Sequence, residues 1–360
     1  MRPIWVTCMW AALGAGLCVA VAVGCSGSTS VEPAQTAAPA TTDESADIIK
    51  AALVTGIGDT GNESFSASCV KGLDRATKDF GLVTTVVEPT SSIGVEASLT
   101  KLSGDGYDPI FIAAPDTADA VAKVAIATPW VTYCGIGEFY DPPIANTIGL
   151  HFKEQEAGYL AGVLAGTLTT RTSVDRRING KKVIGFVGGR QTPVVRRYAA
   201  GFIAGAKKAN PAVAVRIVYT GSPTDQKKAN RAAMALIGRG ADIIFAAADR
   251  SSVGCAEACR DNGALFIGAD TDQALTIPGI GDTIITSAMR KVDNAVYDTV
   301  TKYIEGTLVG GRNVAYGIKE DGVGLSPYHK WKSRLPADVE AAVEKAAAEV
   351  VSGVYTVPEV

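Results

Sequence analysis

The chain has 360 residues, more than one hydrophobic core usually serves, so we expect two lobes. Charged residues make up 20% and hydrophobic residues 47%, an ordinary balance for a soluble globular protein. The formal net charge of -3 argues against nucleic acid as a partner, since nucleic-acid binders need a basic face. The two histidines, His151 and His329, are far apart and lack metal-ligand spacing, so we expect no zinc site.

The first 24 residues have the order of a secretory signal peptide. Arg2 supplies a positive charge, residues 4–23 are apolar, and small residues precede Cys25. The segment resembles a bacterial lipobox, which implies that Cys25 carries a diacylglycerol thioether; Ala22 departs from the Leu, Val or Ile that is commoner there. A simple cleaved signal and an uncleaved membrane anchor are the alternatives. We expect a lipid-anchored protein on the extracytoplasmic face of the cell membrane.

Residues 25–46 follow as a predicted flexible tether. They are mostly Ser, Thr, Ala and Pro with few acids and no periodic apolar pattern. Such a segment cannot bury enough surface to offset the entropy lost on ordering.

Strands and helices then alternate in two successive series. The first predicts strands at 48–54, 82–87, 109–113, 130–134 and 146–152, with helices at 64–80, 94–102, 116–128 and 153–168. The second predicts strands at 183–189, 213–220, 242–248 and 265–269, with helices at 193–210, 225–238 and 251–263. A strand at 283–288, a helix at 291–306, a strand at 314–318 and a helix at 336–352 complete the chain.

This alternation predicts an α/β fold with two doubly wound, Rossmann-like lobes joined by a hinge. We expect lobe I at 47–170, lobe II at 171–285, and a return segment at 286–360 that completes both. The crossovers between lobes are predicted near 169–181, 275–285 and 318–328. Small residues at four-residue spacing in the helix at 153–168, Ala157, Ala161 and Ala165, predict close packing of that helix on a sheet.

Four cysteines lie in the body, Cys69, Cys134, Cys255 and Cys259. Export permits disulfides. Cys255 and Cys259 are one helical turn apart, however, which is a poor spacing for an unstrained bridge. We expect buried free thiols, because a body of this size does not need cross-links.

Ligands of open parallel sheets bind beyond the carboxyl ends of the strands, beside helix amino termini. The loops at these ends carry several carboxylates suited to hydroxyls or amines, together with Ser and Arg side chains. The alternative role for each Asp or Ser is to cap a helix. The candidates are Asp59, Ser64, Phe65, Ser66, Asp225, Asp249, Asp270 and Arg290.

The sequence offers little for catalysis. Residues 56–61 match a dinucleotide fingerprint on paper, but the loop continues through residues 62–64 before helical periodicity begins. No Lys-Ser or Lys-Thr follows Gly188-Gly189, so there is no P-loop, and neither histidine accompanies a Ser or Cys at a strand end. We therefore expect no cofactor and no enzymatic activity.

Several blocks resemble the basic membrane protein family of lipoproteins, which includes purine nucleoside receptors of ABC importers. The blocks are residues 58–65, 152–162, 185–189, 201–205, 219–222, 267–273 and 286–290. The resemblance covers most of residues 48–325. It implies a type I periplasmic-binding-protein-like fold whose lobes close about a small polar solute, with a purine nucleoside as one candidate. It also implies an ABC permease as partner, and we expect a monomer.

The resemblance assigns roles to three residues. Phe65 corresponds to a stacking platform for a planar base, Asp270 to an acceptor for ribose hydroxyls, and Arg290 to a lysine that reaches the ligand. Core packing is the alternative for Phe65.

Four positions depart from the nucleoside-binding pattern: Gly56 for an Asp, Ser66 for an Asn, Pro223 for a second Phe, and Asp249-Arg250 for a Gly-rich turn. Losing one aromatic of a sandwich costs about 1 kcal/mol of stacking. Arg250 and Arg290 suit an anionic or more polar ligand. An exported enzyme acting on nucleosides or sugars, and a surface receptor or adhesin without a transporter, remain alternative functions.

Overall fold

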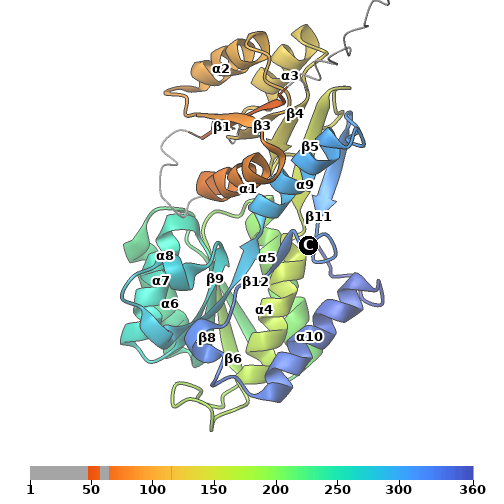
Figure 1. Ribbon diagram of the computed structural model, residues 1–360. Helices are drawn as coiled ribbons and strands as arrows, with labels where there is room; N and C mark the ends of the chain where they lie inside the picture. The colour runs from red at the N-terminus through yellow and green to blue at the C-terminus, as the bar shows by residue number, and fades with distance from the viewer. Residues whose placement is uncertain (1–47, 57–64, 115, 360) are drawn as a thin grey trace, which may run out of the picture. The chain divides into compact units, whose positions relative to one another are not determined.

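The computed structural model describes residues 48–56, 65–114 and 116–359 (Figure 1). Residues 47–360 form one compact unit that contains two six-stranded sheets. The signal segment, Cys25, the tether, Asp59 and Ser64 lie outside the described residues. Within the described part of the chain, no helix combines the length and the apolar character needed to cross a membrane.

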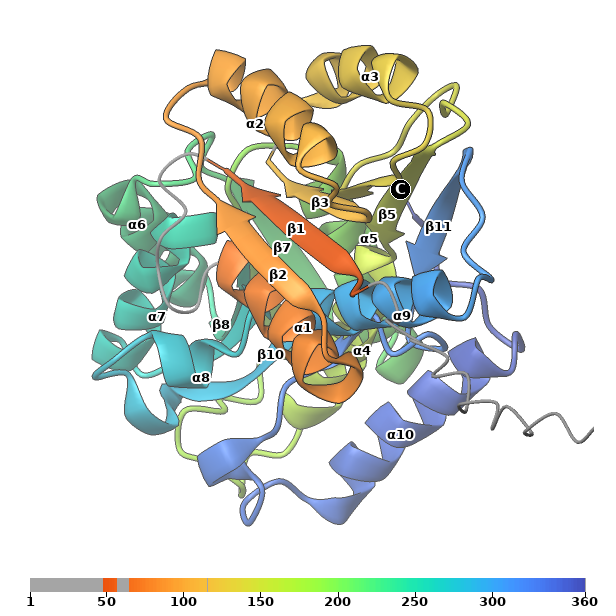
Figure 2. The ribbon, with the colours of Figure 1, turned by 45° about the horizontal axis from the view of Figure 1, so that its top comes forward.

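The first sheet is entirely parallel and has the strand order β11-β5-β4-β3-β1-β2. Its strands are β1 (Lys50–Thr55), β2 (Val83–Val87), β3 (Ile110–Ala113), β4 (Tyr133–Ile136), β5 (Thr147–Phe152) and β11 (Arg312–Tyr316). Two pairs of helices cover its two faces (Figure 2). The pairs are α1 (Phe65–Phe80) with α9 (Val292–Ile304), and α2 (Ser92–Gly104) with α3 (Ala118–Ala127). We call this sheet and its helices lobe I.

The second sheet has the strand order β12-β10-β9-β8-β6-β7 and is parallel except for β12. Its strands are β6 (Val183–Gly188), β7 (Ala214–Tyr219), β8 (Ala241–Ala247), β9 (Leu265–Asp270), β10 (Ile284–Arg290) and β12 (Val323–Leu325). Its helices are α4 (Glu154–Leu168), α5 (Pro193–Ala209), α6 (Gln226–Gly238), α7 (Ser252–Asp261), α8 (Gln273–Thr276) and α10 (Ala337–Val351). Short 3₁₀ turns are η1 (Asp249–Ser251), η2 (Gly281–Thr283) and η3 (His329–Trp331). We call this sheet and its helices lobe II. The predicted α/β fold of two doubly wound lobes is confirmed.

The chain passes between the two sheets at three places. The passages are from β5 to α4 at Lys153, from β10 to α9 at Lys291, and from β11 to β12 between Tyr316 and Val323. The crossover expected near 318–328 is confirmed, but those expected near 169–181 and 275–285 are wrong. Helix α4 already packs on α5 in lobe II, and β10 still pairs with β9, so both polar stretches are loops within lobe II. The division of the chain into lobe I at 47–170, lobe II at 171–285 and a return segment at 286–360 stays a prediction.

Glycines bring α4 and α5 into close contact. A Cβ built on Gly158 or Gly162 of α4 would overlap a backbone carbonyl of α5, and one built on Gly201 or Gly205 would overlap a carbonyl of α4. The expected close packing is therefore present, but its partner is a helix and the residues that permit it are glycines. The alanines of the predicted stripe are buried beside this contact.

The four cysteines of the body are free and buried, which confirms the prediction of thiols without a disulfide framework. Burial raises the pKa of the Cys255 thiol to about 12, so this side chain stays protonated at neutral pH.

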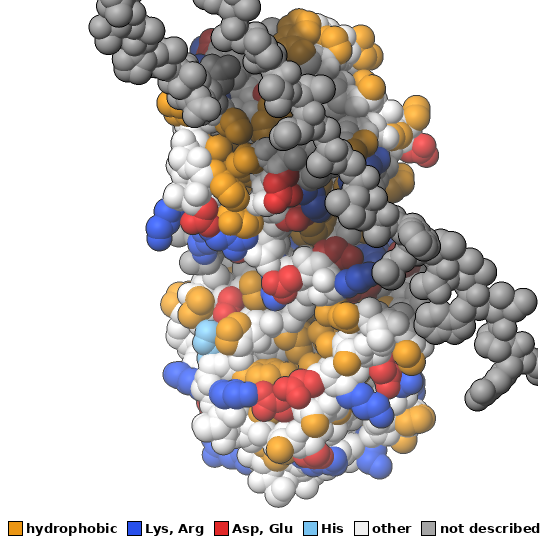
Figure 3. Space-filling view, turned by 45° about the vertical axis from the view of Figure 1, so that its right-hand side comes forward, with side chains coloured by type: hydrophobic (Ala, Val, Ile, Leu, Met, Phe, Trp, Pro, Cys, Tyr) orange, Lys and Arg blue, Asp and Glu red, His pale blue; other side chains and the backbone are white. Residues whose placement is uncertain are grey.

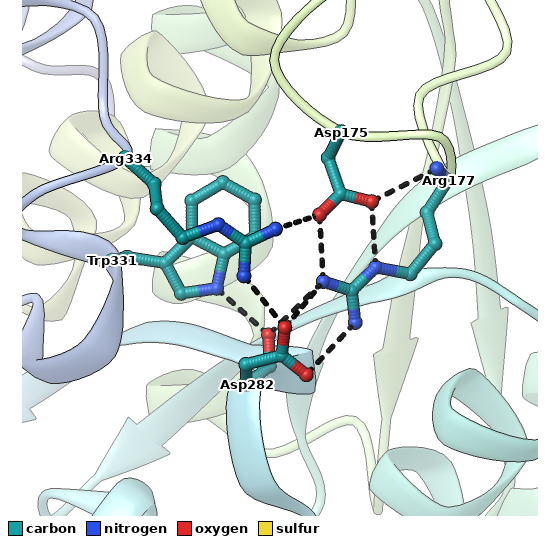
Figure 4. A network of polar contacts seen from close by, with 5 residues as sticks. All are labelled: Asp175, Arg177, Asp282, Trp331 and Arg334. Atoms are coloured by element: carbon teal, nitrogen blue, oxygen red, sulfur yellow. Dashed lines mark hydrogen bonds and ion pairs between the residues drawn. The ribbon is translucent and has the colours of Figure 1, made fainter.

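An ionic network fixes the chain that follows β12 to the rest of lobe II (Figure 4). Arg177 lies 2.8 Å from Asp175 and 3.2 Å from Asp282, and Arg334 contacts the same two carboxylates. The buried indole of Trp331 donates a hydrogen bond to the Asp282 carbonyl (2.8 Å) and lies under both guanidinium groups. Hydrogen bonds from Arg177 hold the pKa of Asp175 at about 2.

Candidate functional site

Three predicted site residues end neighbouring strands of lobe II. Asp249 follows β8, Asp270 ends β9, and Arg290 ends β10. Because β8, β9 and β10 are parallel neighbours, their carboxyl ends share one edge of the sheet. We call this edge of lobe II, together with the matching edge of lobe I, the carboxyl-edge site.

Arg290 joins residues from both lobes at this edge. Its Nε lies 2.7 Å from Asp270 Oδ1, and its Nη1 lies 3.9 Å from Glu154 Oε1. Its guanidinium carbon lies 4.8 Å from the centroid of the Phe65 ring, at the first turn of α1 in lobe I. The structure thus brings Phe65, Asp270 and Arg290 together, and their contact with a ligand stays a prediction.

Side chains of α4 and α5 contact Arg290 and its partner Asp270. Glu154, at the start of α4, is buried and accepts a 2.6 Å hydrogen bond from Arg197 Nε. The hydroxyl of buried Tyr198 lies 3.2 Å from Asp270 Oδ1. Burial alone would lower the pKa of Arg290, but the carboxylates of Asp270 and Glu154 raise it by more. The guanidinium group therefore stays charged, and these two carboxylates balance its charge.

Asp249 has the environment expected of a ligand acceptor. Its side chain is open to solvent, yet surrounding protein atoms and the negative charge of Asp270 raise its pKa above the usual value. Its backbone is left-handed, with φ of 49°, and that of Asp270 is too, with φ of 66°. A non-glycine residue keeps a left-handed backbone only where the surrounding fold holds it there, and such residues are common at functional sites.

Lobe I contributes acidic groups at its own carboxyl edge. Asp116 follows β3 and is left-handed as well, with φ of 57°, and Glu138 follows β4. Burial, and then the charge of Asp116, raise the pKa of Glu138. Phe65 packs near this group, since a Cβ on Gly137 would lie 3.8 Å from Phe65 Cζ.

The remaining predicted site residues are placed differently. Asp225 caps α6 and accepts a 2.9 Å hydrogen bond from the Lys228 amide, which is the capping role weighed against ligand binding. Ser66 is buried in the first turn of α1. Asp59 and Ser64 lie outside the described residues. A ligand contact by any of the four stays a prediction.

An open pocket of about 520 Å³ lies elsewhere, beside the second and third crossovers. Its lining includes Met289, Lys291, Leu325 and Tyr328, none of which is a predicted site residue. We therefore define the candidate site by its side chains and their contacts.

Comparison with known proteins assigns the family. The model of the Bmp family, described as ABC transporter substrate-binding protein PnrA-like, matches residues 49–358. The chain belongs to the Bmp family.

Curated relatives of this Bmp protein span nearly its whole length. It is 28% identical to Basic membrane protein A1 of Borrelia garinii subsp. bavariensis over 302 residues, 82% of this chain and 85% of that protein. It is 29% identical to the CD4+ T-cell-stimulating antigen of Listeria innocua over 335 residues, 88% of this chain and 90% of that protein. The family resemblance predicted from the sequence blocks is confirmed.

Solved structures agree on the fold. A solute-binding protein of an ABC transporter system from Aeropyrum pernix matches with a TM-score of 0.71 and 25% identity, over 86% of this chain and 94% of that one. One from Conexibacter woesei matches with a TM-score of 0.71 and 23% identity, over 86% of this chain and 99% of that one.

Sequence reasoning missed five residues of this candidate site, although a signal existed for some of them. Asp116 follows a predicted strand, so the rule of strand ends applied to its loop too. Glu154 stood inside a recognised block but was assigned to packing. Nothing in the sequence singled out Glu138, Arg197 or Tyr198, because their places depend on how α5 and β4 pack.

Proposed function

We propose that this Bmp protein is the extracytoplasmic solute-binding lipoprotein of an ABC importer and that it binds a small polar solute between its lobes without converting it. One observation carries the proposal. Arg290, at a crossover between the sheets, contacts Phe65 of lobe I and both Asp270 and Glu154 of lobe II. A ligand bound at this place would contact both lobes, and such differential contact is what couples binding to closure.

The charges of the site favour a neutral or cationic ligand. Arg290 is only 14% exposed, and its charge is already matched by Asp270 and Glu154. Within the described residues, Asp116, Glu138 and Asp249 form no ion pair with a basic side chain, although the charges of Arg290, Arg190 and Arg250 lower the pKa of Asp249. Carboxylates of this kind accept hydrogen bonds from hydroxyl or amino groups and repel an anion.

A purine nucleoside is the ligand we propose first. Its planar base has a partner in the Phe65 ring, and its ribose hydroxyls have acceptors in Asp249 and Asp270. We further propose Asp59, Ser64, Ser66 and Asp225 as additional contacts, although the capping role of Asp225 weakens its case. The missing second aromatic at Pro223 lowers the expected affinity.

The proposal includes the cellular setting. We propose that Cys25 is lipidated, that residues 25–46 tether the body to the cell membrane, and that an ABC permease receives the solute from a monomer. Supporting this is the order of the first 25 residues, together with membership of a substrate-binding family.

A calorimetric titration with nucleosides, free bases, sugars and amino acids tests the function, with chromatography of the recovered ligand. We expect a nucleoside to bind and to be recovered unchanged. If every nucleoside failed while another class bound, the ligand assignment would be wrong. Recovery of a converted product would instead establish the enzyme alternative.

A further inference from the structure

Exposed apolar side chains gather at the amino edge of the lobe I sheet. Ile48 precedes β1, Trp130 precedes β4, and Val309 precedes β11, and all three are exposed. These strands are parallel members of one sheet, so their amino ends lie at one edge. Helix α3 runs from the carboxyl end of β3 back to this edge, which places Ile126 of its last turn there as well. We call these four residues the amino-edge surface.

The fold holds Trp130 outward. Ile126 and Trp130 are each 70% exposed, whereas the neighbouring Val131 is buried. The side-chain Nδ2 of Asn146 donates to the carbonyls of Ala125, Thr128 and Val131 at 3.1, 3.1 and 2.8 Å. The loop is therefore fixed on both sides of the indole. A large exposed indole next to an isoleucine loses the burial energy that a partner surface would restore.

The chain itself indicates the partner. The tether and Cys25 join the body at Ile48, on this same surface. A flexible chain of the length of residues 25–46 has an end-to-end distance of about 25 Å, so it would hold this edge near whatever Cys25 is anchored in. In Figure 3 hydrophobic side chains are visible at the top, the end at which Figure 1 draws α2 and α3.

We propose that the amino-edge surface lies on the outer face of the lipid membrane, with Trp130 at the level of the headgroups. The inference rests on the proposed lipid anchor at Cys25. Indole rings favour this depth because one end is apolar and the other donates a hydrogen bond. The carboxyl-edge site lies at the opposite edge of the sheet, so the contact leaves that site accessible for capture of the solute.

Charged side chains also lie at this edge of lobe I. Lys101 pairs with Asp105 and Lys123 with Glu96. Lys50, the first residue of β1, donates to the Asp105 carbonyl (3.2 Å), and Arg312, the first residue of β11, is exposed. These two cations would face anionic headgroups, so we expect the apolar contact to strengthen with the fraction of anionic lipid and to weaken with salt.

Tryptophan fluorescence tests the contact. Trp5 and Trp10 precede Cys25, so the mature protein keeps Trp130 and the buried Trp331. The acylated full-length product is reconstituted into phosphatidylcholine vesicles with brominated acyl chains, which quench nearby indoles. We expect a blue shift and a loss of emission that the Trp130→Phe variant does not show. A matched control places an indole on lobe II, as Leu275→Trp in the Trp130→Phe background, where Leu275 is 67% exposed; it should not be quenched.

The outcomes separate the contact from the anchor. Unquenched Trp130 in a protein whose Cys25 is acylated would overturn the contact alone. An unmodified Cys25 in the mass spectrum of the mature protein would overturn the anchor. A blue shift in native membranes without quenching by brominated lipid would assign the surface to a protein partner and contradict the proposal.

Discussion

The ion pairs of Arg290 with Asp270 and Glu154 bear on which ligand charge the candidate site would accept. From the sequence, Arg290 and Arg250 suited an anionic ligand. In the structure Arg290 is bound to Asp270 and Glu154, so a ligand anion would have to break a buried charge pair to reach it. The nearby Asp249 and Glu138 add like-charge repulsion.

We therefore predict that inosine binds and inosine 5′-monophosphate binds at least about tenfold more weakly, because Arg290 is already paired and the phosphate would meet the carboxylates of Asp249 and Glu138. Competitive calorimetry of the two compounds measures the ratio. Equal or tighter binding of the monophosphate would show that Arg290 exchanges its partners for the ligand.

A buried aspartate gives stability a pH dependence. Asp242 accepts hydrogen bonds from the Thr169 hydroxyl and the Asn179 amide, and burial raises its pKa to about 6. Between its unfolded and folded pKa values the folded state holds a proton that the unfolded state has lost. The free energy of unfolding should therefore fall as the pH rises from about 4 to 6, by up to about 3 kcal/mol, and level off above.

Urea unfolding of the wild type and of Asp242→Asn at several pH values between 4 and 7 checks this. The variant should lack the fall. Parallel profiles for the two proteins would show that Asp242 keeps an ordinary pKa.

At the scale of residues, sequence reasoning found the site where chemistry and strand ends coincide. Asp270 and Arg290 follow predicted strands, Phe65 stands at the start of a predicted helix, and all three lie in recognised blocks. The left-handed backbone of Asp116, Asp249 and Asp270 is invisible in the sequence, because aspartate adopts it only where the surrounding fold requires it. The capping role of Asp225 could have been preferred, since it stands directly before a predicted helix.

The contact between α4 and α5 is the tightest feature at the scale of elements. A Cβ at Gly201 would overlap the Gln155 carbonyl and lie 2.8 Å from the Tyr159 nitrogen, and neither backbone can yield easily.

We predict that Gly201→Ala lowers the free energy of unfolding by about 1–3 kcal/mol or more through overpacking. Gly104→Ala is the matched control: Gly104 ends α2 with open space around its Cβ, so the change should be neutral or stabilise by up to about 1 kcal/mol. Denaturant unfolding of both variants provides the comparison. Equal effects would mean that the two helices can separate at little cost.

The ionic network around Trp331 also belongs to this scale, because it joins three segments of lobe II. The lowered pKa of Asp175 means that its stabilising contribution is present above about pH 4 and is lost as the pH falls toward 2. We predict that Asp175→Asn is less stable than the wild type at pH 7 and that the difference shrinks on acidification in that window. Thermal unfolding across that range checks it, and a constant difference would contradict it.

Element types followed the hydrophobic pattern closely, and the errors have local causes. Residues 130–134 were predicted as a strand, but β4 begins at Tyr133 because Asn146 holds the preceding loop and the Thr132 amide donates to Asp108. Strand β12 has three residues and pairs antiparallel with β10, so its short sequence carries no period to detect.

At the scale of the whole molecule, the two lobes followed from the repeated alternation of strands and helices. The positions of two of the three crossovers could not be predicted in this way, because hydrophobic periodicity predicts a strand or a helix but not which lobe it joins. Helix α4 follows a strand of lobe I directly and packs in lobe II, where its glycines fit those of α5. Only the packing of α4 against α5 shows that α4 belongs to lobe II.

The central claim is that one solute contacts both lobes at the carboxyl-edge site. Calorimetric titration of the best-binding nucleoside into the wild type, Phe65→Ala of lobe I and Asp249→Asn of lobe II tests it, with Ser91→Ala as a control, since Ser91 caps α2 after strand β2 and is not a proposed ligand contact. We predict that both site variants lose about tenfold or more in affinity while the control binds as the wild type does. Unchanged affinity in either site variant would place the ligand outside this site and contradict the account.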